Sequence, residues 1–506
     1  MTQSLTAAVE AMEVVELRRR LQWAELKIQK LEEMLRLARI AKYGPASEKL
    51  NDAQLLLLEG EPGVSWDEVV AESTREALPE DKPQPKIAKH PGRQSLPEDL
   101  PRVVKLIAAQ PEECSCKACG AETKVIGYDE SERLDVEPAR YFVVVTKREK
   151  RACRRCADGG VQMAPLPVSI LDKSLVSDRI VIDTVVAKYS DHLPLYRQSA
   201  ILAREAGVEI SRATMDGWVM RVGEMLLPVA ERMRIDLLSG TYIQADETPV
   251  DVQVSNGSGS NHQAYLWQYG KPGGETVFDF RMGRGREGPK KFLAEFEGIL
   301  QTDGYAAYDR VGGQKIVRAA CWAHARRKFV EVLKLSPKDV AAARIVAAMD
   351  ALFAVDARAR ELGVEERHRL RIEKSGPLLE ALREELKRLQ RESLPASALG
   401  KAATYTLTLW PKLMSFLKHA ELELSNNLAE NSMRGVALGR KNWIHIGSEK
   451  AGPKVAAILS VVESCKRLGV PARAYLADIL PGLSDCKIQD VAAKTPAAWV
   501  RSKVSA

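Results

Sequence analysis

The stretch from 241 to 282 constrains the fold more than any other part of the sequence, because it alternates strand-like runs with tight turns. Thr241–Val250 is rich in β-forming residues and reaches Pro249, which is expected to close the strand. Two further runs, Tyr265–Tyr269 and Thr276–Met282, follow turns rich in glycine. The short connections predict three antiparallel strands in series.

Two more strands are expected at Gly298–Gln301 and Ile316–Cys321, after a helix at 290–296 that begins behind Pro289. The order strand-strand-strand-helix-strand-helix-strand is that of ribonuclease-H-like folds, in which the first and fourth strands are neighbours. Asp246 lies near the end of the first strand, and Asp303 follows the fourth. The order therefore predicts two adjacent carboxylates, which can share a divalent metal ion.

Four cysteines form two Cys-x-x-Cys motifs, Cys116 with Cys119 and Cys153 with Cys156. Each pair can present two thiolates to one ion, and four thiolates at tetrahedral geometry suit zinc. A strand is expected between the motifs at 140–146, so the segment is predicted to be a zinc ribbon. Four unrelated thiols are the alternative, which the repetition of the motif disfavours.

Basic residues surround the second cysteine motif and favour contact with the DNA backbone, with a solvated charge run as the alternative. They are Lys147, Arg148, Lys150, Arg151, Arg154 and Arg155. The formal net charge of +7 over 506 residues permits a nucleic-acid partner without demonstrating one.

Apolar residues near the N-terminus recur in alternating steps of four and three, which predicts a coiled coil that pairs two subunits. They are Leu17, Leu21, Ala24, Ile28, Leu31, Leu35 and Ala38. One amphipathic helix packed on its own domain is the alternative. No apolar run reaches the ~20 residues of a membrane span, and no signal peptide is evident, so we expect a cytoplasmic protein with reduced thiols and no membrane partner.

A helical region precedes the strands, with one helix expected at Tyr196–Ala206 and another, capped by Ser211, at Ala213–Val222. Its spacing is compatible with a helix-turn-helix and equally with a plain helical hairpin. The segment 335–420 is rich in Ala, Leu, Glu and Arg at helical spacing and predicts a helical insertion.

Further candidate functional residues flank this insertion. Before it, the helix start carries His324, Arg326, Arg327 and Lys328, which we interpret as a phosphate clamp beside the acidic sheet; a solvated helix start is the alternative. After it, Glu430 lies in the first turns of a helix capped by Ser425 or Asn426. Basic residues that follow are Arg434, Arg440 and Lys441.

These motifs together resemble those of the insertion-sequence-66 family of DDE transposases, and the resemblance covers nearly the whole chain. The segments that carry it are Tyr43–Leu50, Leu96–Arg102, the two Cys-x-x-Cys motifs, Asp191–Arg197, Asp246–Thr248, Thr302–Tyr305, Cys321–His324, Asn426–Glu430 and Gly439–Trp443. The family usually has Asp where Ser425 stands and Arg where Asn431 stands. Neither departure touches the three acids, and both predict a weakened capping or phosphate contact.

The resemblance implies that Asp246, Asp303 and Glu430 bind two Mg²⁺ or Mn²⁺ ions and catalyse DNA strand cleavage and strand transfer. It implies terminal inverted repeats and target DNA as partners, a homo-oligomer, accessory transposition proteins for many members, and a bacterial, nucleoid-associated location. Two alternatives stay open: a catalytically retired DNA-binding repressor, and a nuclease of the same fold that cuts without joining.

The fold class expected is a multidomain chain of mixed α+β and α/β type, with a ribonuclease-H-like core interrupted by an α-helical insertion. Its predicted parts are a coiled-coil helix (1–50), a basic, proline-rich linker (51–105), a zinc-binding domain (106–165), a helical region (166–235), the first part of the core (236–334), the helical insertion (335–420), the second part of the core with Glu430 (421–465) and a C-terminal helical tail (466–506).

Overall fold

The computed structural model describes residues 140–152, 161–254, 261–443 and 445–504, together with six residues between 18 and 31. The chain divides into two compact units, and all the elements described below belong to the unit that contains residues from Arg148 onward. The four cysteines of the Cys-x-x-Cys motifs, with Arg154 and Arg155, lie outside the described residues.

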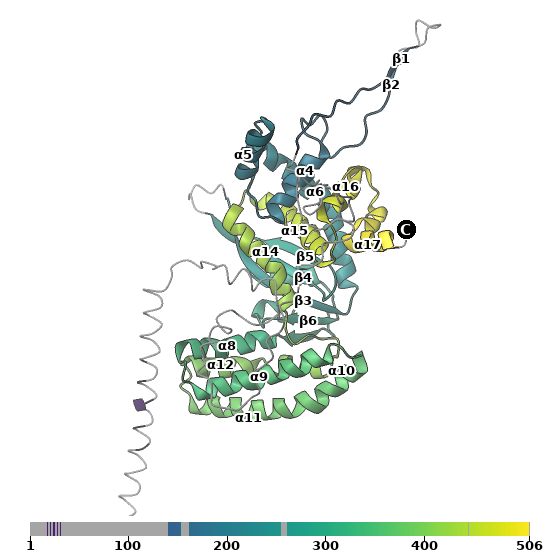
Figure 1. The fold of residues 1–506 in the computed structure, drawn as a ribbon. Coiled ribbons are helices and arrows are strands. Elements are labelled where there is room, and N and C mark those ends of the chain that lie inside the picture. Colours follow the sequence, from purple (N-terminus) through teal and green to yellow (C-terminus); the bar gives the residue numbers. More distant parts are fainter. Residues whose placement is uncertain are drawn as a thin grey trace, which may run out of the picture. The chain divides into compact units, whose positions relative to one another are not determined.

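A mixed sheet forms the centre of this unit, with its strands in the order β5-β4-β3-β6-β7 (Figure 1). The strands are β3 (Tyr242–Val252), β4 (His262–Gly270), β5 (Thr276–Arg281), β6 (Ile299–Thr302) and β7 (Val317–Ala320). β4 runs antiparallel to β3 and β5, whereas β6 is parallel to β3 and β7 is parallel to β6. A sixth, short strand, β8 (His445–Ile446), pairs in parallel with the far end of β3. The prediction that the first and fourth strands are neighbours is confirmed.

The first strand is longer than predicted, because Pro249 does not end it. On one side of β3, the pairing with β6 ends at Gln244, and the pairing with β8 begins only at Asp251. In the gap between them, the carbonyl of Pro249 accepts a hydrogen bond from the Arg440 side chain at 2.6 Å. A residue's N–H and C=O point to the same side of a strand, so no ladder partner there requires the missing proline N–H.

Two helix predictions in the sheet region were wrong in detail. The helix expected at 290–296 is α7 (Glu287–Leu293), so Pro289 is its third residue rather than its first. The helix expected between the fourth and fifth strands is a single 3-10 turn, η2 (Ala306–Tyr308). The connection is too short and too rich in glycine for more than that turn.

The strand expected at 140–146 is absent, since residues 140–149 have no strand assignment. A strand requires a partner ladder, and the described residues offer none beside this segment. The hairpin lies further along, where β1 (Lys150–Ala152) pairs antiparallel with β2 (Val161–Met163).

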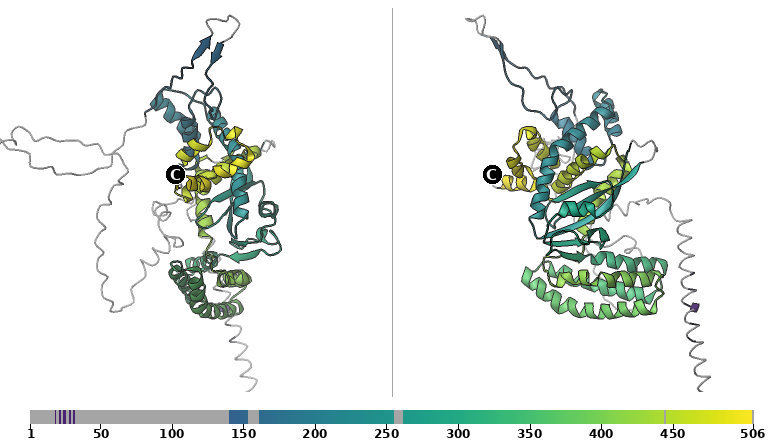
Figure 2. Two further views of the ribbon diagram at one scale, coloured as in Figure 1. Left: turned by 90° about the vertical axis from the view of Figure 1, so that its right-hand side faces the viewer. Right: turned by 180° about the vertical axis from the view of Figure 1, so that it is seen from behind.

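Helices pack beside the β5 edge of the sheet (Figure 2). α6 (Arg212–Leu238) and α15 (Gly452–Arg467) contact β5, whereas α4 (Asp178–Tyr189) packs on α6 and α15, and α5 (Leu195–Ala206) packs on α4 and α6. α15 packs along β5, where Ser460 and Ser464 accept the backbone N–H groups of Phe278 and Thr276 at 2.8 and 2.9 Å. These two hydroxyls satisfy N–H groups of a strand that has no neighbouring strand on that side within the described residues.

The helical region before the sheet begins and ends where expected, except at its last boundary. Gly207 ends α5 with a φ of 66°, and the Ser211 hydroxyl caps α6 by accepting the N–H of Thr214. α6 does not stop at Val222 but continues to Leu238, because its buried residues recur at helical spacing along the whole length.

The insertion is helical, as predicted. Its elements, with the helix that leads into it, are α8 (Trp322–Leu335), α9 (Val340–Ala359), α10 (Val364–Leu370), the π-helical turn η3 (Arg371–Ser375), α11 (Gly376–Glu392), α12 (Ala398–Thr408), α13 (Trp410–Leu413) and η4 (Met414–Leu417). Trp322, Trp410 and Phe416 pack edge to face in its core. Arg371 is fully buried, bonds the Asp356 carboxylate, and donates to carbonyl groups between Phe416 and Leu422.

The remaining helices follow the insertion. They are α14 (Asn427–Trp443), η5 (Glu449–Ala451), α16 (Ala472–Ile479), η6 (Leu483–Asp485), η7 (Ile488–Lys494) and α17 (Pro496–Val504). The basic stretch Gly439–Trp443 is the last part of α14. Across the described ranges, no helix is both long and apolar enough to cross a membrane.

Candidate active site

Asp246 lies within β3, two residues beyond the last pair of the β3–β6 ladder, and not at the strand's end as predicted, whereas Asp303 directly follows β6. The β3–β6 ladder pairs Gln244 with Gln301, and the same register continued by two residues sets Asp246 opposite Asp303. Gln244 Nε2 donates to Gln301 Oε1 at 3.0 Å, so the two glutamine side chains share one face of the sheet. Because side chains alternate along a strand and neighbouring strands lie about 4.8 Å apart, the aspartates are expected to share that face as well.

The turn after β6 fixes the Asp303 backbone. The carboxylate of Asp303 accepts the N–H of Tyr305 at 2.8 Å, and its carbonyl accepts the Tyr405 hydroxyl at 2.6 Å. Gly304 has a φ of 96°, and a Cβ there would lie 2.6 Å from Leu409 Cδ1. This tight turn therefore requires glycine directly after the aspartate.

α14 brings the third acid, Glu430, to the same region. The carbonyl of Asn426 accepts the N–H groups of Ala429 and Glu430, so the helix begins there and Glu430 lies in its first turn. The Asn426 side chain donates to the carbonyl of Ala245, directly before Asp246, at 3.4 Å. An acidic residue in the first turn is also favoured by the helix dipole.

A buried polar network ties the segment before α14 to the sheet. Gln301 donates to the carbonyl of Glu423 at 2.7 Å, and Gln244 donates to the carbonyl of Ser425 at 3.0 Å. The Tyr242 hydroxyl donates to Gln301 Oε1 at 2.5 Å. Two glutamines, each two positions before an aspartate, therefore hold the start of the helix that carries Glu430.

Burial and three nearby carboxylates affect the pKa of Asp246. Burial raises it well above its ordinary value, and the negative charges of Glu430, Glu247 and Asp303 raise it further, in that order. Glu247 is a neighbour of a different kind, because its carboxylate accepts hydrogen bonds from Arg284 at 2.8 Å and from Tyr308 at 2.9 Å. As the adjacent strand residue it is expected to face the opposite side of the sheet from Asp246.

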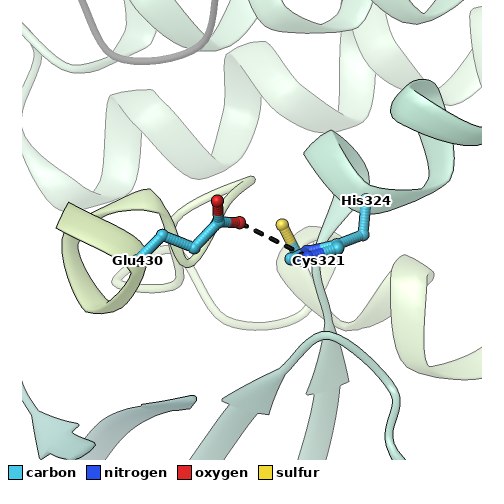
Figure 3. A group of neighbouring side chains, drawn as sticks. All are labelled: Cys321, His324 and Glu430. Carbon is cyan, nitrogen blue, oxygen red and sulfur yellow. Dashed lines mark ion pairs between the residues drawn. The ribbon is translucent and has the colours of Figure 1, made fainter. Parts of the chain in front are cut away.

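Glu430 has a second set of neighbours at the start of α8 (Figure 3). Its Oε2 atom accepts a hydrogen bond from Arg327 at 3.0 Å, and its Oε1 atom lies 3.5 Å from His324 Nε2. Cys321, His324 and Glu430 offer ligand atoms that all lie within 4.8 Å of one another. This is the metal-ligand group found within the described residues, and Asp246 and Asp303 do not belong to it.

Sequence reasoning read His324 as part of a phosphate clamp and did not identify the Cys321–His324–Glu430 group. The Cys-x-x-His spacing at the start of a helix was the signal that could have found it. Burial lowers the pKa of His324 more than the charge of Glu430 raises it, so the imidazole is neutral at neutral pH.

The other residues predicted to contact DNA have different surroundings. Arg326 pairs with the carboxylate of Asp350 on α9 at 2.6 Å. Arg440 donates to Thr248 Oγ1 and to the carbonyl of Pro249, and so joins α14 to β3. These two side chains bond to the protein itself, and their predicted contact with DNA stays a prediction.

Three further basic residues lie at the surface. Lys328 pairs with Glu331 at 3.6 Å and lies over the ring of Tyr405. Arg434 and Lys441 are exposed on α14. They are accessible to a phosphate backbone.

Comparison with known families decides the class of the chain. The family model described as "Transposase IS66 family" matches residues 173–454, which is more than half of the chain. The chain belongs to the IS66 transposase family. A second model, described as "zinc-finger binding domain of transposase IS66", matches residues 113–157, which include both Cys-x-x-Cys motifs and support structural zinc. A third, a leucine-zipper model described as "Transposase C of IS166 homeodomain", matches residues 30–104.

Three proteins from one organism are similar in sequence to this chain over most of their length. "Uncharacterized protein y4qI" of Sinorhizobium fredii (strain NBRC 101917 / NGR234) is 33% identical over 494 residues, which cover 94% of this chain and 89% of the relative. From the same organism, "Uncharacterized protein y4jD" is 34% identical over 77% of this chain and 79% of its own length. "Uncharacterized protein y4hP" is 28% identical over 95% of this chain and 89% of its own length.

Proposed function

We propose that the chain is a DNA transposase that cleaves and joins strands at a site formed by Asp246, Asp303 and Glu430. The observation that carries the proposal is the convergence of these acids. Asp246 and Asp303 each lie two residues beyond the last pair of the parallel β3–β6 ladder, in matching register, and the charge of Glu430 is the largest charge effect on the pKa of Asp246. Strongly perturbed carboxyl groups that gather in one place are typical of catalytic sites.

The topology supports the same conclusion. The strand order β5-β4-β3-β6-β7, with β4 antiparallel to both neighbours, agrees with the ribonuclease-H-like order that the sequence predicts. Membership of the IS66 transposase family implies DNA as the substrate. We therefore assign the chemistry to the acidic residues at β3 and β6 rather than to the helical insertion.

The acids fit a hard divalent cation. Asp246 is largely buried, and three neighbouring carboxylates raise its pKa, so mutual repulsion opposes ionisation of the acids and a bound cation would relieve it. Asp246, Asp303 and Glu430 would hold Mg²⁺, which when bound neutralises this charge, activates the attacking oxygen and stabilises the leaving oxygen. Arg327 orients Glu430 by binding its Oε2 atom.

The reaction proposed has two displacements at phosphorus. First, the oxygen of water bonds to phosphorus at the element's end, the bond from phosphorus to the 3′ oxygen breaks, and that oxygen leaves with a proton as a 3′-hydroxyl. Then the 3′-hydroxyl loses its proton and bonds to a phosphorus of the target DNA, whose own 3′ oxygen leaves. Each step exchanges one phosphorus–oxygen bond for another.

Recognition of DNA would use surfaces outside the acids. The exposed Arg434 and Lys441 on α14, the basic start of α8, and Arg154 and Arg155 in the matched zinc-finger segment suit contacts with phosphates. The DNA bound in this way would be the terminal inverted repeats of the element and the target DNA.

The apolar residues at heptad spacing near the N-terminus support pairing of two copies of the chain. Leu21, Ile28 and Leu31 are helical and more than half exposed in the single chain. An apolar seam at heptad spacing that is exposed in one chain is suited to burial against a second copy.

The test is cleavage of DNA carrying the element's ends, in Mg²⁺, by the Asp303→Asn variant. We expect cleavage to be abolished while DNA binding persists, and Asp251→Asn, at an exposed position on β3, to cleave normally. Cleavage by the Asp303→Asn variant at the normal rate would overturn the assignment. Supplying pre-cleaved ends separates the alternatives, because a nuclease would not join them and a repressor would neither cut nor join.

A further inference from the structure

We propose that Cys321, His324 and Glu430 form a second metal site, specific for a thiophilic divalent cation such as Zn²⁺ or Co²⁺, which competes with the acidic site for Glu430. The metal site itself depends only on these three side chains. The competition rests on the proposed function, because it matters only if Glu430 also serves Asp246 and Asp303.

The strand register places Cys321 beside Asp303. The β6–β7 ladder pairs Thr302 with Ala320, so Cys321 follows at the level of Asp303, and its N–H donates to the carbonyl of Thr302 at 3.0 Å. Cys321 then stands directly before α8, and His324 lies three residues later on the first turn. This geometry points both side chains toward Glu430 (Figure 3).

Glu430 Oε1 is the unpartnered atom of this group that a cation would satisfy, and His324 faces it with Nε2 at 3.5 Å and not with Nδ1. His324 Nδ1 and Glu430 Oε1 are buried, and neither has a hydrogen-bond partner among the described residues. Arg327 satisfies only the other carboxylate oxygen, Oε2. A buried polar atom without a partner is costly, and a shared metal ion would offset that cost.

The environment of the sulfur supports a thiolate once a metal is present. The N–H of Asn426 donates to Cys321 Sγ at 3.4 Å, and the backbone N–H groups of Ala323 and His324 also lower the thiol pKa. Burial outweighs them and raises the pKa of Cys321 to about 12, so the free thiol keeps its proton. Metal binding would break the S–H bond, form a metal–sulfur bond and release the proton to solvent.

The chemistry of the donor set decides the kind of ion. One thiolate, one imidazole and one carboxylate match zinc-like ions, whereas Mg²⁺ and Mn²⁺ prefer oxygen ligands alone. Tetrahedral ligands of zinc lie roughly 3.5 Å apart, so atoms within 4.8 Å require only small side-chain movements. Three protein ligands leave one position open for water or a phosphate oxygen.

The direct test is a Co²⁺ titration of the full chain without DNA, after the cysteine motifs have been loaded with zinc. We expect one additional Co²⁺ with a thiolate-to-cobalt charge-transfer band, and Cys321→Ser to abolish that band. His324→Ala should weaken Co²⁺ binding by about 10–100-fold or more, since even an outer-shell partner of a metal ligand is worth that much. Cys465→Ser, at another buried cysteine, is the matched control and should retain the band.

Zinc release is followed by mass spectrometry, so that exchange into the cysteine motifs is recognised. A band that persists in Cys321→Ser, or no band in folded wild-type protein, would overturn the second metal site. Circular dichroism of each variant separates a lost site from a lost fold.

A second experiment tests the competition. Zn²⁺ should inhibit Mg²⁺-dependent DNA cleavage by the wild type, and the inhibiting concentration should rise about 10–100-fold in Cys321→Ser, measured against that variant's own uninhibited rate. Equal inhibition of both proteins would overturn the competition. If Co²⁺ binds as expected but no cleavage occurs under any condition, the proposed function fails and the metal site stands.

Discussion

Replacing Gln301 by Leu tests whether the buried polar network holds Glu430 beside the aspartates. The change removes the acceptor for the Tyr242 hydroxyl and the donor for the Glu423 carbonyl, which are bonded at 2.5 and 2.7 Å. Gln244 keeps its bond to the Ser425 carbonyl. The Tyr242 O–H therefore loses its acceptor, although its oxygen still accepts from Gln244, and the Glu423 carbonyl loses its side-chain donor. Each such loss at a buried group costs about 1–3 kcal/mol.

We accordingly expect Gln301→Leu to lower the free energy of unfolding by about 2–6 kcal/mol, less what the apolar leucine regains on burial. Urea unfolding followed by tryptophan fluorescence measures this. Cleavage at low temperature, where the variant stays folded, should also be slower, because the start of α14 is no longer tied to β6. Gln390→Leu is the matched control, since this exposed glutamine bonds only Thr404 at 3.2 Å among the described hydrogen bonds, and surface changes usually stay within about 0.5 kcal/mol.

A double-mutant cycle with Tyr242→Phe makes the reasoning refutable. Once the tyrosine hydroxyl is gone, Gln301→Leu leaves only the Glu423 carbonyl without a partner. The double variant should therefore lose less stability than the sum of the single variants, by about 0.5–3 kcal/mol. Strictly additive losses, or Gln301→Leu with wild-type stability and cleavage, would refute the network's role.

Four further predictions concern other parts of the chain. Burial and nearby carboxylates raise the folded-state pKa of Asp246 well above 3.8, so its ionisation makes the metal-free protein less stable as pH rises from the unfolded value through the folded one. Asp246→Asn should flatten this decline in calorimetry at increasing pH, and an unchanged decline would contradict it. Cys119→Ala should lower zinc stoichiometry and weaken binding to the element's ends; unchanged zinc by mass spectrometry would contradict it. Arg371→Met should destabilise the protein by about 3–5 kcal/mol in urea, because it leaves Asp356 buried without its main partner. Ile28→Glu should dissociate a coiled-coil pair into single chains in sedimentation analysis, and an unchanged mass would argue against pairing through this seam.

Strand pattern predicted the central sheet well, because its strands are short, apolar and separated by clear turns. The order of the elements alone predicted that the first and fourth strands lie side by side, and the β3–β6 ladder confirms this. The end of β3 could not be predicted, since it depends on Arg440 and β8, which come from nearly 200 residues later in the chain. The absence of a strand at 140–146 is a similar case, because a β-forming sequence becomes a strand only beside a partner.

Candidate site residues were predictable by type but not by contact. Asp246 and Asp303 were found from their predicted positions at strand ends, which holds for Asp303 but not for Asp246, because β3 continues to Val252. Basic residues were all read as DNA contacts, whereas Arg326 and Arg440 bond to the protein itself. Sequence spacing shows that a side chain is charged, but only the fold shows which carboxylate or carbonyl lies within reach.

The central claim is that Asp246, Asp303 and Glu430 act on DNA as one metal site. Anomalous diffraction from Mn²⁺ in crystals of the complex with the element's DNA tests it most directly. The account predicts Mn²⁺ held between the carboxylates of Asp246 and Asp303, with Glu430 turned away from His324 to join them. Mn²⁺ bound at other residues in a complex that cleaves its DNA in the crystal would contradict it.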